Sequence, residues 1–207
     1  DNTVEIVKSC MVEDTRIKIF NLLQNSGSAV ARNNSIKESK GRFIAFCDSD
    51  DQWKPEKLKK QIEFMHRENC AFSYTSYDRI KEDGASLRGI DCKSVLKYKD
   101  LLKNNYIGCL TAVYDTEKLG KQYMPLLRKR QDWALWLQLL KECKEAKGLQ
   151  EPLAVYRERS FSISSNKMEM LKYNWLIYHQ VEGFGKIRST FQLSLFIIFY
   201  IKKKLGD

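Results

Sequence analysis

A short apolar run that ends abruptly in carboxylates constrains this chain more than any other feature. Residues 43–47 read Phe-Ile-Ala-Phe-Cys, and Asp48, Asp50 and Asp51 follow at once. An apolar run of this length is typical of a strand buried on both faces of a parallel sheet. Ligands in open α/β sheets bind beyond the carboxyl ends of the strands. The sequence therefore places three acids where a ligand is held.

Carboxylates so close together repel one another unless solvent, a bound cation or proton uptake relieves the repulsion. Hard oxygen ligands at this spacing suit Mg²⁺ or Mn²⁺, which often carry substrate phosphates. A second interpretation is that Asp48-Ser49-Asp50-Asp51 only caps the helix expected from Pro55, because Asp, Ser and Pro all favour helix starts. The acidic turn alone leaves both interpretations open.

Composition limits the remaining choices. A chain of 207 residues with 43% hydrophobic and 30% charged residues is long enough for one well-buried core. A net charge of +10 fits nucleic acid, an anionic membrane surface or a phosphate-bearing substrate. Aromatic and basic residues do not alternate in a nucleic-acid-binding pattern, so we expect no nucleic acid partner. The six cysteines form no C-x-x-C pair, which predicts reduced thiols in a cytoplasmic protein.

Two further motifs flank the acids. The pattern N-x-G-x-x-x-A-R-N occupies residues 25–33, and W-x-P-x-K-L occupies residues 53–58. Together with the acids, in this order, the chain closely resembles the family 2 glycosyltransferases. The residues that carry the resemblance are Asn25, Gly27, Ala31, Arg32, Asn33, Asp48, Asp50, Asp51, Trp53, Pro55, Lys57 and Leu58.

The resemblance implies an α/β GT-A fold, Rossmann-like, with a mostly parallel central sheet flanked by helices. It covers residues 1–165, and a helical segment of residues 166–207 follows. Family members have a first strand and a nucleobase-binding acidic loop before the point where this sequence starts. The resemblance therefore indicates a member shortened at its amino terminus.

The resemblance also implies an inverting transfer of a sugar from a UDP- or GDP-sugar to a saccharide or lipid-linked saccharide acceptor. Such enzymes assemble surface polysaccharide or lipopolysaccharide at the cytoplasmic membrane. Asp48 and Asp50 would hold Mg²⁺ or Mn²⁺, and Asp132, in an E-D-W-like motif, would be the general base. The donor would be bound by Arg32, Asp48, Asp51, Arg157 and Ser162.

Several of these residues also have structural interpretations. Asp132 stands where a helix is expected to begin and would also serve as its cap. Arg32 would also pair with a nearby acid on the surface. The triplet Arg128-Lys129-Arg130 before Asp132 either balances phosphate charge or is solvated surface.

The patterns predict other elements as well. Residues 1–11 indicate a helix, and residues 17–22 and 105–114 indicate strands. An amphipathic helix is expected from Pro55 to Arg67, with Leu58, Ile62 and Met65 inward.

The end of the chain is strongly apolar over residues 193–201 and then reads Lys202-Lys203-Lys204. The apolar run is about half of the ~20 residues that cross a bilayer. Two interpretations stay open: shallow insertion at an anionic leaflet, or a helix packed on the domain.

Three other functions compete with glycosyl transfer. A nucleotidyltransferase would also use carboxylates and a cation beside a phosphate-binding helix. A nucleic-acid-binding module would explain the charge, and its binding would fall steeply with salt. A non-catalytic, membrane-associated remnant is the third alternative.

Overall fold

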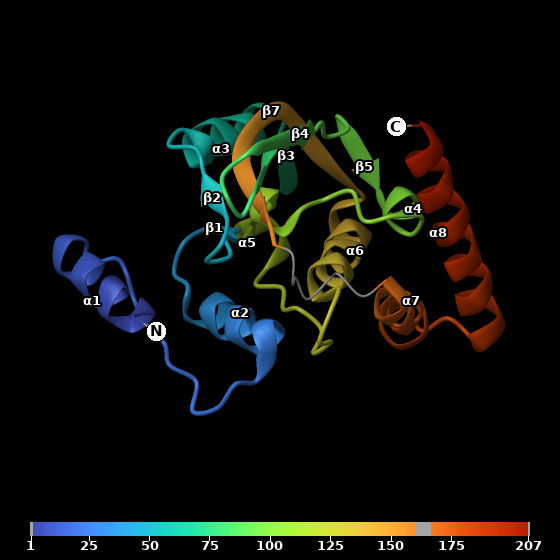
Figure 1. Ribbon diagram of the computed structural model, residues 1–207, viewed down its shortest axis with the longest axis horizontal. Helices are drawn as coiled ribbons and strands as arrows, with labels where there is room; N and C mark the ends of the chain where they lie inside the picture. Colours follow the sequence, from blue (N-terminus) through green and yellow to red (C-terminus); the bar gives the residue numbers. More distant parts are fainter. Residues whose placement is uncertain (1, 160–166, 207) are drawn as a thin grey trace.

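The computed structural model describes the backbone of residues 2–159 and 167–206 and the side chains of residues 2–159 and 168–201. The elements in chain order are α1 (Thr3–Glu13), α2 (Gly27–Glu38), β1 (Phe43–Ala45), β2 (Gln52–Trp53), α3 (Lys57–Arg67), β3 (Phe72–Lys81), β4 (Ser86–Ile90), β5 (Val95–Lys97), α4 (Tyr98–Leu101), the 3₁₀ turn η1 (Cys109–Thr111), β6 (Val113–Asp115), α5 (Thr116–Leu119), α6 (Gln131–Cys143), β7 (Glu145–Glu158), α7 (Lys167–Leu176), the π-helical turn η2 (Ile177–Val181) and α8 (Lys186–Gly206). The expected opening helix is present as α1. It stands apart from the sheet (Figure 1), and none of its residues is buried.

The central sheet has the order β1-β6-β3-β7-β2, with β4 paired to β3 and β5 paired to β7. The predicted α/β class is confirmed, but the sheet is mixed instead of mostly parallel. Only β3 and β7 are parallel among the described pairs, and the others are antiparallel. Parallel strands such as β3 and β7 need a long crossover connection, which the segment from β4 to α6 supplies. Strands β3 and β4 are antiparallel, so a short turn is enough to connect them.

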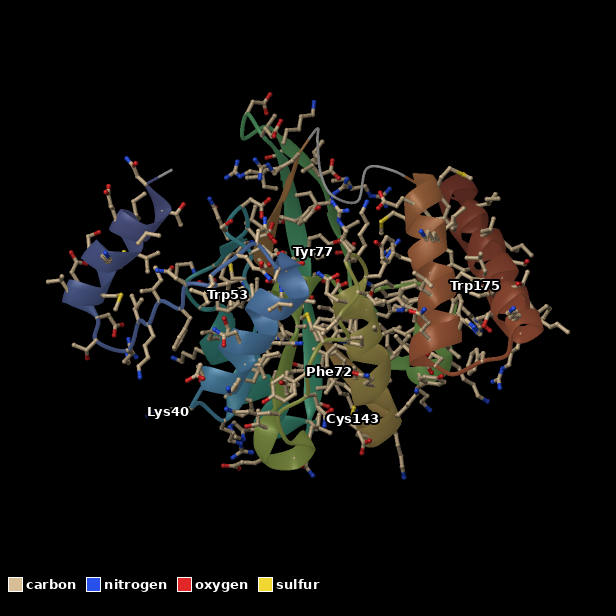
Figure 2. The ribbon with its side chains drawn as sticks, turned by 90° about the horizontal axis from the view of Figure 1, so that it is seen from below. Lys40, Trp53, Phe72, Tyr77, Cys143 and Trp175 are labelled. Atoms are coloured by element: carbon tan, nitrogen blue, oxygen red, sulfur yellow. The ribbon has the colours of Figure 1, made fainter. Side chains whose placement is uncertain are left out.

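Helices cover both faces of the sheet. In β3, Phe72 and Tyr74 face α6, and Ser73 faces α3 on the other side. Phe72 lies between α2 and α6 in Figure 2, where its ring is 5.3 Å from the ring of Trp136. The main core therefore lies between the sheet and the α2–α6 layer.

The α3 face toward the sheet is partly polar. Lys57 and Gln61 are fully buried, and Met65 is buried beside them. Gln61 Nε2 donates to Ser73 Oγ at 3.0 Å and to the Thr111 carbonyl at 2.9 Å. The expectation that Leu58 points inward is wrong, because the buried face follows residues 57, 61, 64 and 65 and leaves Leu58 40% exposed.

Two expected strands are shorter or missing. Residues 17–22 form no strand, because no described segment offers their backbone a ladder of hydrogen bonds. In the region 105–114, only β6 at its end pairs with the sheet, and η1 occupies residues 109–111. Strand β1 also ends at Ala45, two residues earlier than expected.

The C-terminal helices α7 and α8 lie side by side against α4 and α6 (Figures 1 and 2). Phe196 of α8 is buried with its ring 5.6 Å from Trp133. The Tyr178 hydroxyl donates to the Leu102 carbonyl at 2.7 Å, and the buried Glu182 carboxylate pairs with Lys141 Nζ at 2.8 Å. In the part of the chain that the structure describes, no helix is long and apolar enough to span a membrane.

Candidate active site

One cleft of about 1100 Å³ contains most of the predicted site residues. The acidic turn between β1 and β2 contributes Asp48, Asp50 and Asp51, and the first turn of α6 contributes Asp132. Arg32 of α2 and Arg157 of β7 also line it. Ser162 lies outside the described residues. Figure 2 shows the amino-terminal ends of α2 and α6 side by side near Tyr77, which also lines the cleft.

The acidic turn is held in shape by its own backbone and by Trp53. The Asp51 N–H donates to the Asp48 carbonyl at 3.0 Å, which closes the turn. Trp53 Nε1 donates to the Leu110 carbonyl at 2.8 Å and fixes the strand that follows. Phe46, just before the turn, is buried in the main core. The carboxylates therefore project from a turn with both ends anchored.

Asp48 and Arg32 are partners. Arg32 Nη2 donates to both oxygens of Asp48, at 2.5 and 2.6 Å. The Arg32 side chain is 17% exposed and that of Asp48 is 40% exposed, so the pair is open to the cleft. These two residues stand sixteen positions apart in the sequence, which assigned each of them to the donor, and they neutralise each other's charge.

Asp50 and Asp51 are tied to the last residues of β7. The Arg157 N–H donates to Asp51 Oδ1 at 3.2 Å, and Arg157 Nε donates to the Asp50 carbonyl at 3.3 Å. Arg159 Nη1 lies 3.6 Å from Asp50 Oδ2. Burial raises the pKa of Asp51 to about 6, the Arg157 N–H opposes that rise, and Asp48 and Asp50 add to it. Arg159 was not predicted as a site residue, and no sequence motif marks it.

Asp132 is half-buried at the start of α6. It acts electrostatically on two arginines, Arg32 and Arg130, and on the thiol of the half-buried Cys109, whose pKa desolvation raises well above its ordinary value. The preceding Gln131 donates through Nε2 to Ser28 Oγ at 2.5 Å and so joins the start of α6 to the start of α2. Cys109 was missed by the sequence reasoning, which had no signal separating it from the other core thiols.

The basic triplet before Asp132 has three different environments. Lys129 is buried and pairs with Glu169 at 2.6 Å, so it is neither solvated surface nor a free cation. Arg128 is exposed at the cleft. Arg130 is half-buried, lines the cleft and has a left-handed backbone with φ of 65°.

The carboxylates offer hard oxygen donors of the kind that divalent cations take. Within the described residues, no three or more His, Cys, Asp or Glu side chains are grouped to hold a metal ion. Asp48 and Asp50 are each at least one-third exposed, and each pairs with an arginine instead. Two accessible carboxylates on one turn fit a cation that keeps several waters or substrate oxygens among its ligands.

Comparison with solved structures identifies the fold. The chain superposes on Staphylococcus aureus TarS in complex with UDP-GlcNAc with a TM-score of 0.68, at 18% identity, over 95% of this chain and 59% of that one. It superposes on the mannosyltransferase PcManGT from Pyrobaculum calidifontis, in complex with GDP-Man and Mn²⁺, with a TM-score of 0.61, at 10% identity, over 100% of this chain and 64% of that one. The fold is that of the GT-A glycosyltransferases.

Sequence comparison gives the family. The model of Glycosyl transferase family 2 matches residues 1–122. The chain is 43% identical, over 99% of its length and 82% of the relative, to TuaG of Bacillus subtilis strain 168, whose name describes a glycosyltransferase of teichuronic acid biosynthesis. It is 37% identical, over 94% of its length and 76% of the relative, to WfgD of Escherichia coli, named as a UDP-Glc:α-D-GlcNAc-diphosphoundecaprenol β-1,3-glucosyltransferase. The chain belongs to glycosyl transferase family 2, as the motifs predicted.

Proposed function

We propose that this protein transfers a sugar from a UDP- or GDP-sugar to an acceptor hydroxyl, with inversion at the anomeric carbon. The observation that carries the proposal is the single cleft in which the acidic turn, Arg32 and Asp132 meet. In one displacement, the acceptor oxygen bonds to the anomeric carbon while the bond from that carbon to the diphosphate breaks. Holding both substrates in one cleft supplies part of the rate by orientation.

Asp48 and Asp50 would hold Mg²⁺ or Mn²⁺ at the rim of this cleft. A bound cation would act as a Lewis acid that neutralises the charge developing on the departing diphosphate. Arg32 would give up its contact with Asp48 and bind a donor phosphate, because its planar guanidinium recognises either kind of oxyanion. Arg157, Asp51 and Ser162 complete the predicted donor site, with Arg157 also fixing the acidic turn through its contacts with Asp50 and Asp51.

Asp132 is the proposed general base. It takes the proton of the acceptor hydroxyl as the oxygen attacks the anomeric carbon. The nucleoside diphosphate leaves without taking up that proton. The N-cap residue of α6 is Arg130, and Asp132 lies inside the first turn, where a carboxylate also interacts favourably with the helix dipole. The half-buried placement in the cleft favours a role in chemistry over a cap alone.

The names of two relatives support a proposal for the acceptor. The name of WfgD describes an acceptor sugar joined to diphosphoundecaprenol, and that of TuaG describes teichuronic acid biosynthesis. We propose a saccharide or lipid-linked saccharide acceptor in surface polysaccharide assembly, at the cytoplasmic face of the membrane.

Helix α8 supplies a surface for that membrane. Ile187, Phe191, Ile198 and Ile201 are all exposed and follow one face of the helix, whereas Phe196 packs inward. Basic residues stand at both ends of the helix in the sequence, at 186, 188 and 202–204. An apolar helix face with flanking cations fits shallow insertion into an anionic leaflet.

Vesicle sedimentation tests the membrane contact. The protein is expected to sediment with vesicles that contain phosphatidylglycerol and much less with pure phosphatidylcholine, and Phe191→Asp should remove most of the binding. Val12→Asp is the matched control, because Val12 is 84% exposed on α1. Equal binding of the two variants would exclude α8 as the contact.

Calorimetric titration tests the donor site. UDP or GDP should bind the folded protein only with Mn²⁺ or Mg²⁺ present, and Asp50→Ala should abolish the cation-dependent part. The reaction should release a nucleoside diphosphate, whereas pyrophosphate release would indicate a nucleotidyltransferase. A folded sample that binds neither nucleotide with either cation would favour the non-catalytic remnant.

A further inference from the structure

The cleft contains cations that the proposed donor chemistry does not use. Lys93, before β5, and Arg128 and Arg130, before α6, all line it. None of the three forms an ion pair with a carboxylate in the part of the chain whose side chains are described. The other basic side chains at the cleft are neutralised or tied to the acidic turn: Arg32 by Asp48, Lys129 by Glu169, Arg159 by Asp50, and Arg157 through the Asp50 carbonyl.

Arg130 is the most deeply placed of the three. Its guanidinium carbon lies 5.7 Å from the centre of the Trp133 ring, and its Nε is buried with no hydrogen-bond partner among the described residues. Residues 160–166, which the structure does not describe, contain no acid in their sequence. Asp132 acts electrostatically on Arg130 but forms no ion pair with it among the described contacts. A half-buried arginine charge without an ion-pair partner favours an anion that arrives with a ligand.

The backbone at Arg130 carries a further cost. Its φ of 65° is left-handed, a conformation that strains the backbone of a non-glycine residue. The strained residue stands two positions before Asp132 and directs its side chain to the cleft. Strain of this kind is concentrated at functional sites.

The surroundings of Arg130 separate it from the donor side. Tyr178 and Tyr200, in the C-terminal segment, act electrostatically on its guanidinium, and so does Asp132. Arg32, beside the acidic turn, is influenced by Asp132, Asp48 and Cys109. Trp133, beside Arg130, contacts the rings of Tyr178 and Phe196, whereas Arg32 contacts Asp48 of the acidic turn. Arg130 therefore stands toward the C-terminal helices, whose Met170 and Phe199 also line the cleft.

We propose that Arg130, with Arg128 and Lys93, binds a phosphate or diphosphate group of the acceptor, so that the acceptor is a saccharide carried on a phosphorylated lipid. This inference rests on the proposed function, because it assigns the other end of the cleft to the donor. The guanidinium fork of Arg130 matches phosphate oxygens, and Lys93 and Arg128 add charge at the rim. Binding the acceptor by its phosphate would place its sugar hydroxyl beside Asp132.

A diphosphate could come from the donor or from the acceptor, and a competition titration distinguishes the two. Decyl diphosphate is titrated calorimetrically into the full chain, first alone and then with UDP and Mn²⁺ at saturating, matched concentrations. Binding is expected in both conditions. Displacement of decyl diphosphate by UDP would overturn the proposal, because Arg130 would then belong to the donor site. Absence of binding to the wild-type protein would overturn it as well.

Variants then assign the binding to the three cations. Arg130→Gln should weaken decyl diphosphate binding at least about tenfold, as expected for a lost hydrogen bond between charged groups, and Arg130→Lys should weaken it less. If Arg130→Gln fails to fold, Arg128→Gln tests the same site, because Arg128 is exposed and its replacement should not affect folding. Lys59→Gln is the control, because it removes the same charge from an exposed residue of α3, and it should leave the affinity for decyl diphosphate unchanged.

The outcome is distinguishable from failure of the proposed function. If UDP does not bind with Mn²⁺, the donor proposal fails, and the titration without UDP still measures the role of Arg130. If UDP binds normally and Arg130→Gln leaves decyl diphosphate affinity equal to that of Lys59→Gln, the acceptor site is wrong while the donor site stands.

Discussion

Arg32 and Asp48 neutralise each other's charge at the cleft. Both oxygens of Asp48 accept from one nitrogen of Arg32, at 2.5 and 2.6 Å, and both side chains are partly open to the cleft. A cation that binds Asp48 must therefore displace a guanidinium or share the carboxylate with it. Donor phosphates would lower the free-energy cost of displacing Arg32 from Asp48, because they give Arg32 another partner.

Arg32→Gln should separate these two effects. Without nucleotide, Mn²⁺ is expected to bind the variant more tightly than the wild type, because Asp48 no longer has a competing partner. UDP affinity with Mn²⁺ present should fall at the same time. Electron paramagnetic resonance of free Mn²⁺ and calorimetry with UDP give the two readings. Unchanged Mn²⁺ affinity would show that Arg32 does not compete for Asp48.

Asp132→Asn tests the base. The amide keeps the size of the side chain and does not accept a proton at neutral pH, so turnover should fall at least about 100-fold. Donor affinity should stay close to wild type, because Asp132 is expected to contact the acceptor. Steady-state turnover and UDP-sugar titration are the measurements. Normal turnover in a folded variant would remove Asp132 from the mechanism.

At the scale of elements, α3 explains part of the W-x-P-x-K-L motif. Lys57 is fully buried, donates to Gln61 Oε1 at 2.5 Å and stands 5.0 Å from the centre of the Trp53 ring. Burial lowers its pKa to about 8, which the nearby Cys47 opposes. The motif therefore joins β2 to α3 through a buried lysine, beneath the strand that follows the acidic turn.

The stability contributed at Lys57 should depend on pH. Its folded pKa lies below the unfolded value, so the unfolded chain binds more protons between about pH 8 and about pH 10. The wild type should gain stability over this window relative to Lys57→Met, which has no group to titrate there. Urea unfolding of both proteins at about pH 7 and about pH 9.5 measures the difference. A constant difference would contradict the lowered pKa.

Gly148 in β7 allows the strand to approach the segment that carries Lys93. A Cβ at Gly148 would stand 2.0 Å from the Lys93 carbonyl oxygen, and the Gly148 N–H already donates to the Ser94 carbonyl at 2.8 Å. Gly148→Ala should therefore lower the free energy of unfolding by at least about 2 kcal/mol. Gly41→Ala is the control, because its Cβ would be 3.7 Å from its nearest neighbour. Equal stability of the two variants in urea unfolding would contradict the close approach.

For the whole molecule, the C-terminal helices share the core of the sheet domain. Phe196 is 4% exposed against Trp133, and Ile177 and Tyr178 belong to the same buried cluster. Hydrogen bonds from Tyr178 and Gln192 to the Leu102 carbonyl, at 2.7 and 2.9 Å, add to this contact. The helices thereby place Met170 and Phe199 at the cleft while α8 keeps an exposed apolar face.

Shared packing predicts a single cooperative unfolding transition. Phe196→Ala should lower the free energy of unfolding by about 3–5 kcal/mol, because it leaves a cavity against Trp133. Far-ultraviolet circular dichroism and tryptophan fluorescence should report the same midpoint in urea. Phe191→Ala, on the exposed face of α8, should change stability little. Two separate transitions would show that the helical segment folds independently.

Sequence reasoning was most successful where one short segment carries its own signal. The opening helix, the helix after Pro55 and the helix from Gln131 have local apolar periods or capping residues, and all three are present. It failed at the strand of residues 17–22, whose apolar alternation has no described neighbour to pair with. It also predicted too much parallel pairing, because the direction of each neighbour depends on connections far away in the chain.

The sequence by itself determined the family, through the order of the glycine, arginine, acid and tryptophan motifs, because each motif is a local pattern of chemistry. The roles assigned to Arg32, Asp48, Asp50, Asp51, Asp132, Arg157 and Ser162 stay predictions. Only the tertiary structure decided that Arg32 neutralises Asp48 and that α8 packs on the core with one face left open. It also decided that Lys129 is paired while Arg130 has no ion-pair partner among the residues whose side chains are described. These contacts join residues far apart in sequence, and their energies depend on burial and on which side chains face each other, which no local pattern specifies.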